Sequence, residues 1–123
     1  MITEDYVSFE TAKLLKDKGF NEPCLYYYFS DGIIGRRKGL KDRNCPSVNT
    51  FSMPTYQMAM KWLREVYNIH IVLSPNKKMN NQYCSIIFVD KDGELHPQPT
   101  DFFHGSYKET AEAAIKYCLE NLI

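Results

Sequence analysis

Residues 54–73 read PTYQMAMKWLREVYNIHIVL and predict a helix that leads directly into a strand. Apolar side chains recur with the 3.6-residue period of an α-helix, at positions Tyr56, Ala59, Met60, Leu63, Val66 and Tyr67. Pro54 suits the first turn, where its missing N–H costs no hydrogen bond. We expect this stripe to pack on a sheet. Met58 and Trp62 form a second apolar ridge, which either meets another helix of the chain or contacts a partner.

The composition is that of a folded globular protein, and we expect a single domain over residues 1–123. Of these residues 44% are hydrophobic and 14% aromatic. Lys plus Arg equals Asp plus Glu, at 15 each, so the net charge gives no sign of a nucleic-acid or membrane partner. The longest apolar run, over residues 24–29, is far shorter than the ~20 residues of a membrane span. The N-terminus lacks the basic and apolar regions of a signal peptide, which predicts a cytoplasmic location.

Two Asp-Gly pairs predict β-hairpins. Asp31-Gly32 connects a strand over residues 24–30 to a return strand. Asp92-Gly93 connects a strand over residues 83–89 to an edge strand near residues 94–96. The continuous apolar centre of the 83–89 strand is typical of a central position in a sheet. Because the chain shows no βαβ rhythm, we expect an antiparallel α+β fold.

Capping signals place the two other helices. Ser8 precedes a helix over residues 9–18, which Gly19 ends. Ser106 and Glu109 form a capping box at the start of the last helix. Its inner face is expected to hold Ala111, Ala114, Ile115, Cys118 and Leu122. The predicted order of elements is therefore α-β-β-α-β-β-β-α.

The longest predicted loop, over residues 35–53, is basic. It holds five positive charges, offset only by Asp42, at Arg36, Arg37, Lys38, Lys41 and Arg43. Such a cluster can grip phosphates, and the neighbouring aromatic residues 26–29 offer a surface on which bases can stack. The alternative interpretation is a solvated loop in a neutral protein.

No motif points to catalysis, and we assign no catalytic, cofactor-binding or metal-binding residue. The chain has no nucleophile elbow, phosphate-binding glycine loop or zinc-protease motif. Its four cysteines are irregularly spaced, at Cys24, Cys45, Cys84 and Cys118. We expect Cys84 and Cys118 to be small buried apolar residues. His96, Asp101 and His104 supply only three ligands for a metal, and ordinary loop polarity explains them better.

Two segments resemble a known family. Residues 5–20, DYVSFETAKLLKDKGF, look like the opening of a family of small uncharacterised proteins from gut Bacteroidales and their phages and mobile elements. Residues 54–65 look like that family's central motif, and the tyrosine-containing C-terminal helix is also similar. The resemblance covers most of the chain except residues 33–50 and 75–82. It brings no activity or site residue and implies only a cytoplasmic accessory protein of phage or mobile-element origin.

Together these observations favour a small non-enzymatic α+β protein that binds another protein or a second copy of itself. Met58 and Trp62 are its candidate interface. The alternative is a nucleic-acid-associated accessory protein that uses the basic residues of the 36–43 loop. An enzyme with an unrecognised site is the third reading.

Overall fold

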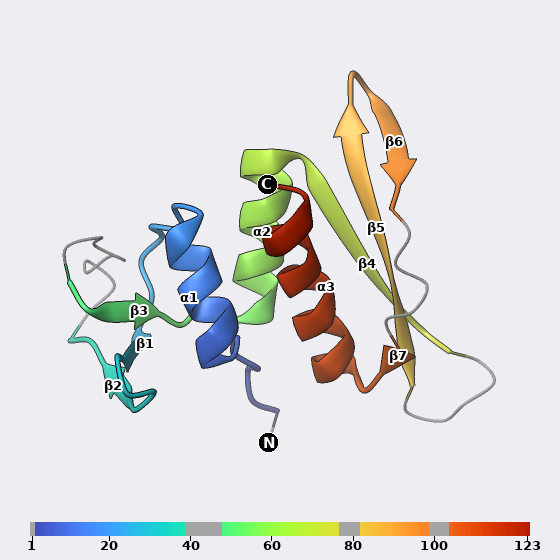
Figure 1. Cartoon of the computed structure of the whole chain (residues 1–123). Coiled ribbons are helices and arrows are strands. Elements are labelled where there is room, and N and C mark those ends of the chain that lie inside the picture. The colour runs from blue at the N-terminus through green and yellow to red at the C-terminus, as the bar shows by residue number, and fades with distance from the viewer. Residues whose placement is uncertain (1, 39–47, 77–81, 99–103) are drawn as a thin grey trace. The chain divides into compact units, whose positions relative to one another are not determined.

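The computed structural model describes residues 2–38, 48–76, 82–98 and 104–123. It confirms the α+β class, with helices and antiparallel strands in the order α1-β1-β2-β3-α2-β4-β5-β6-β7-α3 (Figure 1). The chain divides into two compact units, unit one over residues 1–57 and unit two over residues 58–123. The expectation of a single domain stays a prediction.

Unit one combines α1 (Phe9–Asp17) with a three-stranded antiparallel sheet in the order β2-β1-β3. The central strand β1 (Tyr26–Phe29) pairs with β2 (Ile34–Arg36) and with β3 (Thr50–Ser52). The predicted Asp31-Gly32 hairpin between β1 and β2 is confirmed, since the glycine adopts a φ of 87° and the strands pair antiparallel.

The ends of α1 follow their sequence signals. The Ser8 hydroxyl accepts a hydrogen bond from the backbone N–H of Thr11, at 3.2 Å, which caps the first turn. Gly19 adopts a φ of 93° just past the helix, as expected for a left-handed stop. The ring of Phe9 packs against Tyr28 of β1 and Phe51 of β3, with centroids 5.3 and 5.7 Å apart. Helix α1 therefore covers one face of the unit-one sheet.

The sheet of unit two has four strands and is antiparallel. The long strand β5 (Tyr83–Lys91) is central, as predicted, and pairs with β4 (Ile69–Pro75), β6 (Glu94–Pro97) and β7 (His104–Gly105). Asp92 and Gly93 have φ of 55° and 83° in the turn between β5 and β6. Positive φ at both positions is the geometry of a type I′ turn, and the second predicted hairpin is confirmed.

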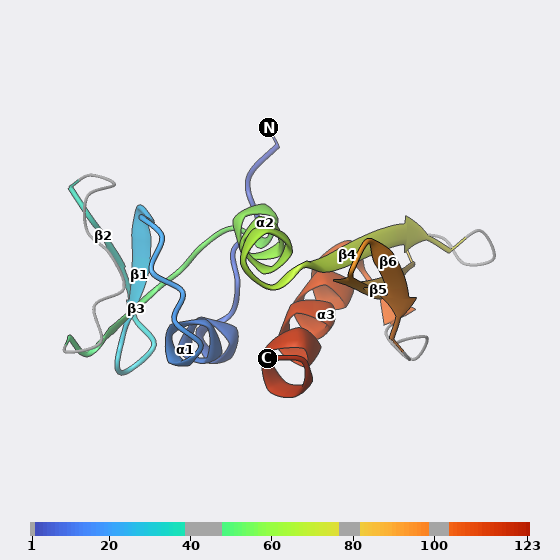
Figure 2. The ribbon, with the colours of Figure 1, turned by 90° about the horizontal axis from the view of Figure 1, so that it is seen from above.

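Helix α3 (Tyr107–Asn121) covers one face of this sheet, and Figure 2 shows no described helix on the other. Both hydrogen bonds of the predicted capping box between Ser106 and Glu109 are present. Four of the expected inner-face residues are fully buried: Ala111, Ala114, Ile115 and Cys118. The fifth, Leu122, is the half-buried C-cap, and Leu119 is buried in its place.

Two strands lie outside the predicted order, β3 and β7. The expectation of a loop over residues 35–53 is therefore wrong in part, because β3 lies within that segment and β2 extends into it. Strands of two or three residues are too short to display the alternation that identifies a strand in sequence. Their pairing is decided by β1 and β5, which lie elsewhere in the chain.

Helix α2 (Tyr56–Tyr67) ends where predicted but begins after Pro54, which was expected in its first turn, and it does not show all of the predicted packing. Val66 was expected in the buried stripe, yet it is 54% exposed in the last turn. The helix that lies on the unit-two sheet is α3, and among the described residues α2 makes no comparable approach to a strand. Only Asn68, with a φ of 57°, separates α2 from β4.

Leu63 provides a test of the α2 packing, because its side chain is fully buried. Leu63→Ala should lower the free energy of unfolding by about 2–5 kcal/mol through the cavity that it leaves. Val66→Ala is the matched control on the same helix and should change this free energy by less than about 0.5 kcal/mol. Urea denaturation of both variants measures the difference. Equal losses would contradict the assignment of the buried side of α2.

Candidate interaction surfaces

The predicted ridge on α2 is not one exposed patch. Trp62 is buried, and its ring stands edge-to-face against Tyr67 with centroids 5.2 Å apart. Met58 is exposed. Of the two alternatives for this ridge, the structure therefore shows burial within the chain for Trp62, while Met58 alone reaches the surface.

The five basic residues of the predicted polyanion-binding loop do not form one described cluster. Arg36 and Lys38 are exposed at the end of β2, whereas Arg37 between them is only 8% exposed. Lys41 and Arg43 lie outside the described residues. In the described part of the loop, two cations are therefore available to a phosphate.

Arg37 is held inside unit one by the two residues that precede β1. Its Nη1 donates to the carbonyl oxygen of Cys24 at 3.0 Å, and its backbone N–H donates to the carbonyl of Leu25 at 2.8 Å. The guanidinium lies 4.8 Å from the centroid of the Tyr27 ring, a cation–π contact. Among the described residues no carboxylate forms an ion pair with it. A carbonyl and an aromatic ring stabilise this charge.

The aromatic run 26–29 is divided between the two faces of the unit-one sheet. Tyr26 and Tyr28 face the α1 side, where the Tyr28 hydroxyl donates to the carbonyl of Val7 at 2.8 Å. Tyr27 and Phe29 lie on the opposite face, with ring centroids 5.1 Å apart. Because side chains alternate along a strand, the run offers two rings to a ligand and not four.

Gly35 makes room for the Tyr27 ring. It is the cross-strand partner of Tyr27, and a Cβ at this position would lie 2.6 Å from Cζ of the ring. The ring therefore reaches across β2, where Arg37 covers it. Tyr27 and Arg37 serve the packing of unit one, and Phe29 is the exposed ring of this face.

A surface that sequence reasoning missed lies on unit two, on the side of the sheet opposite α3. We call it the apolar face, and it consists of Val72, Ile86, Phe88, Leu95 and Pro97. Val72 pairs directly with Ile86, and Phe88 pairs with Pro97. Val72, Ile86 and Leu95 are 44%, 41% and 56% exposed. The continuous run 86–89 hid this face, because uninterrupted apolar residues are typical of a strand buried on both sides.

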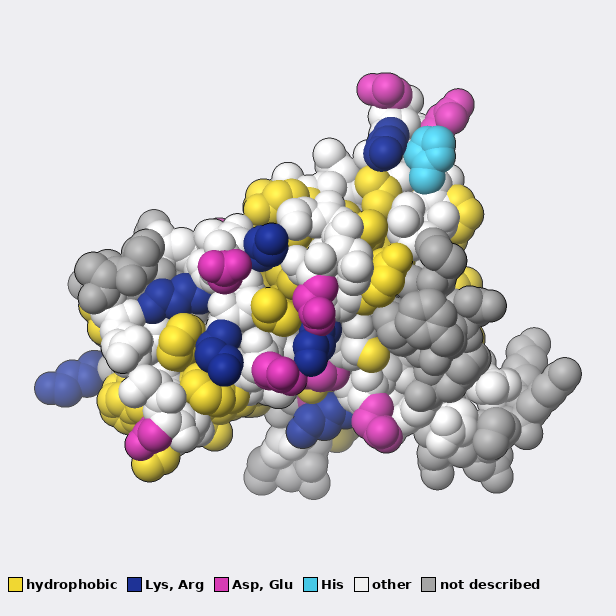
Figure 3. Space-filling view, viewed as in Figure 1, with side chains coloured by type: hydrophobic (Ala, Val, Ile, Leu, Met, Phe, Trp, Pro, Cys, Tyr) yellow, Lys and Arg dark blue, Asp and Glu magenta, His cyan; other side chains and the backbone are white. Residues whose placement is uncertain are grey.

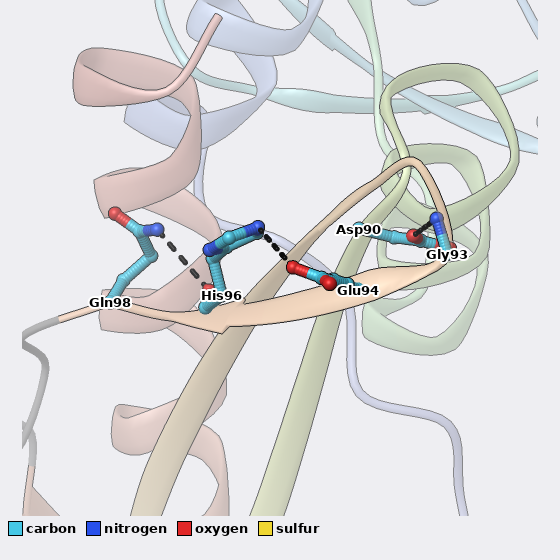
Figure 4. Close-up of polar contacts among 5 residues, drawn as sticks. All are labelled: Asp90, Gly93, Glu94, His96 and Gln98. Atoms are coloured by element: carbon cyan, nitrogen blue, oxygen red, sulfur yellow. Dashed lines mark hydrogen bonds and ion pairs between the residues drawn. The ribbon is translucent and has the colours of Figure 1, made fainter.

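Polar contacts gather at one end of the apolar face, at the tip of the β5–β6 hairpin (Figure 4). An Oδ1 of Asp90 accepts from the backbone N–H of Gly93 at 3.2 Å, and Nε2 of His96 lies 4.0 Å from Oε2 of Glu94. The side chain of Gln98 donates to the carbonyl of His96 at 3.3 Å. Figure 3 shows charged side chains and a histidine gathered at this tip. The bond between Asp90 and Gly93 closes the turn, and Asp90 lies on the same face of β5 as Phe88, so it places a polar group at the end of the apolar face. Glu94 and His96 alternate with Leu95 and Pro97 along β6 and point to the other face of the sheet.

The described thiols are not arranged for chemistry. Burial raises the pKa of Cys24 to about 11, against the opposing effect of the nearby Arg37 guanidinium. Burial also raises the pKa of Cys118 to about 12. Both thiols are therefore protonated at neutral pH and poor nucleophiles. Cys84 is half-buried, with its sulfur 3.7 Å from the carbonyl oxygen of Ser74, and Cys45 lies outside the described residues.

Metal ligands do not converge in the described part of the chain. No group of three or more His, Cys, Asp or Glu residues there could hold a metal ion. Of the three candidate ligands, His96 is at the hairpin tip, while Asp101 and the side chain of His104 lie outside the described residues.

Arg37 and Arg36 form a matched pair for testing the two roles of the basic segment. Arg37→Ala removes a buried charged hydrogen bond and a cation–π contact, so it should lower the free energy of unfolding by about 2 kcal/mol. Arg36→Ala removes an exposed side chain and should change that energy by less than about 0.5 kcal/mol. Thermal and urea unfolding measure both. An Arg37→Ala variant as stable as wild type would contradict the structural role.

No family model, no curated protein and no solved structure matches the chain. The resemblance to small proteins of gut Bacteroidales and their phages therefore stays a prediction. Among the described helices, none is both long and apolar enough to cross a membrane.

Proposed function

We propose that this protein is a non-enzymatic interaction module that binds a protein chain through the apolar face of unit two. The observation that carries the proposal is the exposure of Val72 and Ile86, two β-branched residues that pair directly across β4 and β5. Contiguous apolar residues that remain in water, rimmed by polar groups, mark protein interaction sites.

The size of the apolar face sets the strength of this interaction. Covering the exposed part of Val72, Ile86 and Leu95 would contribute roughly 1 kcal/mol for each side chain. Such a gain is small beside the cost of association, so these contacts alone support a transient complex. The net charge of zero adds no long-range attraction toward a charged partner.

Ile86→Asp tests the proposal, and Val66→Asp is its matched control. Both changes replace an exposed β-branched residue of unit two by a carboxylate, but Val66 belongs to α2 and not to the sheet. After cross-linking in the cells that produce the protein, wild type and Val66→Asp should retain a common partner that Ile86→Asp loses at least tenfold. Circular dichroism shows that each variant is folded. A folded Ile86→Asp protein that keeps every partner would overturn the proposal.

Nucleic-acid binding by unit one is a second candidate function, because Arg36 and Lys38 are exposed at the end of β2. Exposed cations suit a single-stranded polyanion, and the exposed ring of Phe29 lies on the other face of the sheet from Arg36. This candidate function rests on only two described cations, so it is the weaker of the two candidate functions.

Fluorescence anisotropy with a labelled single-stranded oligonucleotide tests this second candidate. Replacing both Arg36 and Lys38 by Ala should abolish a salt-sensitive affinity, and each lost phosphate contact reduces the slope of log K against log salt by about 1. The control replaces Lys61 and Arg64, two exposed cations of α2, and should bind like wild type. Wild-type protein that shows no binding at low salt would exclude the candidate.

A further inference from the structure

The two edges of the unit-two sheet differ in how well they are protected. The β6 edge has four residues, all exposed, with a charge at Glu94 and a proline at Pro97. The β4 edge has seven residues, Ile-His-Ile-Val-Leu-Ser-Pro, with no Lys, Arg, Asp or Glu and its only proline at the end. Charges, prolines and shortness prevent an edge from pairing with another strand. Strand β4 has no such protection before Pro75.

The hydrogen-bond register identifies the backbone groups that β4 leaves open. The N–H of Asp90 donates to the carbonyl of Asn68 at one end of the β4–β5 ladder, and the N–H of Asn76 donates to Gln82 at the other. In an antiparallel pair, alternate residues bond to the neighbouring strand. Even-numbered residues of β4 therefore bond to β5, and Ile71 and Leu73 direct their N–H and C=O groups away from it. No described strand other than β5 pairs with β4.

We infer that two copies of this protein pair β4 with β4, antiparallel about a two-fold axis, to form one continuous sheet. The inference rests on the proposed function and names a second copy of the chain as the partner. Only another strand offers donors and acceptors at the spacing of an open edge. Every copy carries the same edge, and β4 holds no Lys, Arg, Asp or Glu that would repel the same residue of a second copy.

The register centred on Val72 satisfies both the open backbone groups and the exposed side chains. In this register Ile71 of one copy exchanges hydrogen bonds with Leu73 of the other copy. Leu73 of the first copy does the same with Ile71 of the second. The two Val72 side chains then lie directly opposite each other on the apolar face. Since Val72 is already paired with Ile86, the apolar row continues across the two-fold axis. Helix α3 is on the other face of the sheet and does not obstruct this pairing.

Three variants of the full chain distinguish edge pairing from other forms of association. Val72→Lys places two like charges opposite each other at the two-fold axis and should weaken the dimer at least tenfold. Ile71→Pro removes an outward N–H without removing a bond to β5, and it should also weaken the dimer. Leu95→Lys puts the same charge on the apolar face but on β6, and it should leave the dimer unchanged. Sedimentation velocity over a range of concentrations measures all three.

Amide hydrogen exchange provides a second readout that does not depend on substitution. The N–H groups of Ile71 and Leu73 should exchange quickly at low protein concentration and slowly at high concentration, while those of Val72 and Ser74 should be protected at both. A wild-type protein that is monomeric at every concentration would overturn the inference. A dimer that Leu95→Lys disrupts and Ile71→Pro leaves intact would overturn it too, because the copies would then associate through their faces.

These outcomes separate the inference from the proposed function. A wild-type protein that forms no dimer but binds another protein, which Ile86→Asp releases, would refute edge pairing and leave the interaction module standing. A dimer with the expected behaviour, in a protein whose partners are insensitive to Ile86→Asp, would support edge pairing and refute a wider use of the apolar face.

Discussion

The alternation of side chains along a strand decides what each unit buries and what it exposes. Successive residues point to opposite faces of a sheet, so a single helix can cover only every second residue. In unit one, α1 takes Tyr28 and leaves Phe29 in water. In unit two, α3 covers the face that holds Ile87, while its neighbour Ile86 is exposed. The surfaces proposed for function follow from each sheet having a helix on one side.

Local signals in the sequence were sufficient for the helices and the hairpins. The Ser8 and Ser106 caps, the stop at Gly19 and the two Asp-Gly turns depend on residues within four positions of each other, and the structure contains all of them. The short strands β3 and β7, and the choice of α3 rather than α2 as the helix that covers the unit-two sheet, depend on residues far away in the sequence. These features were not predicted. No periodic pattern along β3 or β7 could reveal which strand would pair with it.

The candidate sites were harder to predict, because sequence shows the charge of a side chain but not its burial. Five cations in eight residues suggest a polyanion site, yet Arg37 is bound to a carbonyl and an aromatic ring inside unit one. The alternation of β1 could have signalled this, since Tyr27 and Arg37 lie on the face where Gly35 leaves space. The apolar face was hidden for the opposite reason. Its residues are interleaved with buried ones, and together they form an unbroken apolar run.

The apolar face and the open edge of β4 compensate for each other's weakness as an interface. Backbone hydrogen bonds at an edge fix the register of two strands but are matched by bonds to water when the strands separate, so their net contribution is modest. Apolar contacts add free energy without fixing geometry, because the hydrophobic effect has no direction. Val72 belongs to both, as a member of the open strand and of the exposed row with Ile86. A surface that combines open backbone groups with apolar residues can therefore be specific although it is small. The charged tip of the β5–β6 hairpin beside it disfavours association with unrelated proteins.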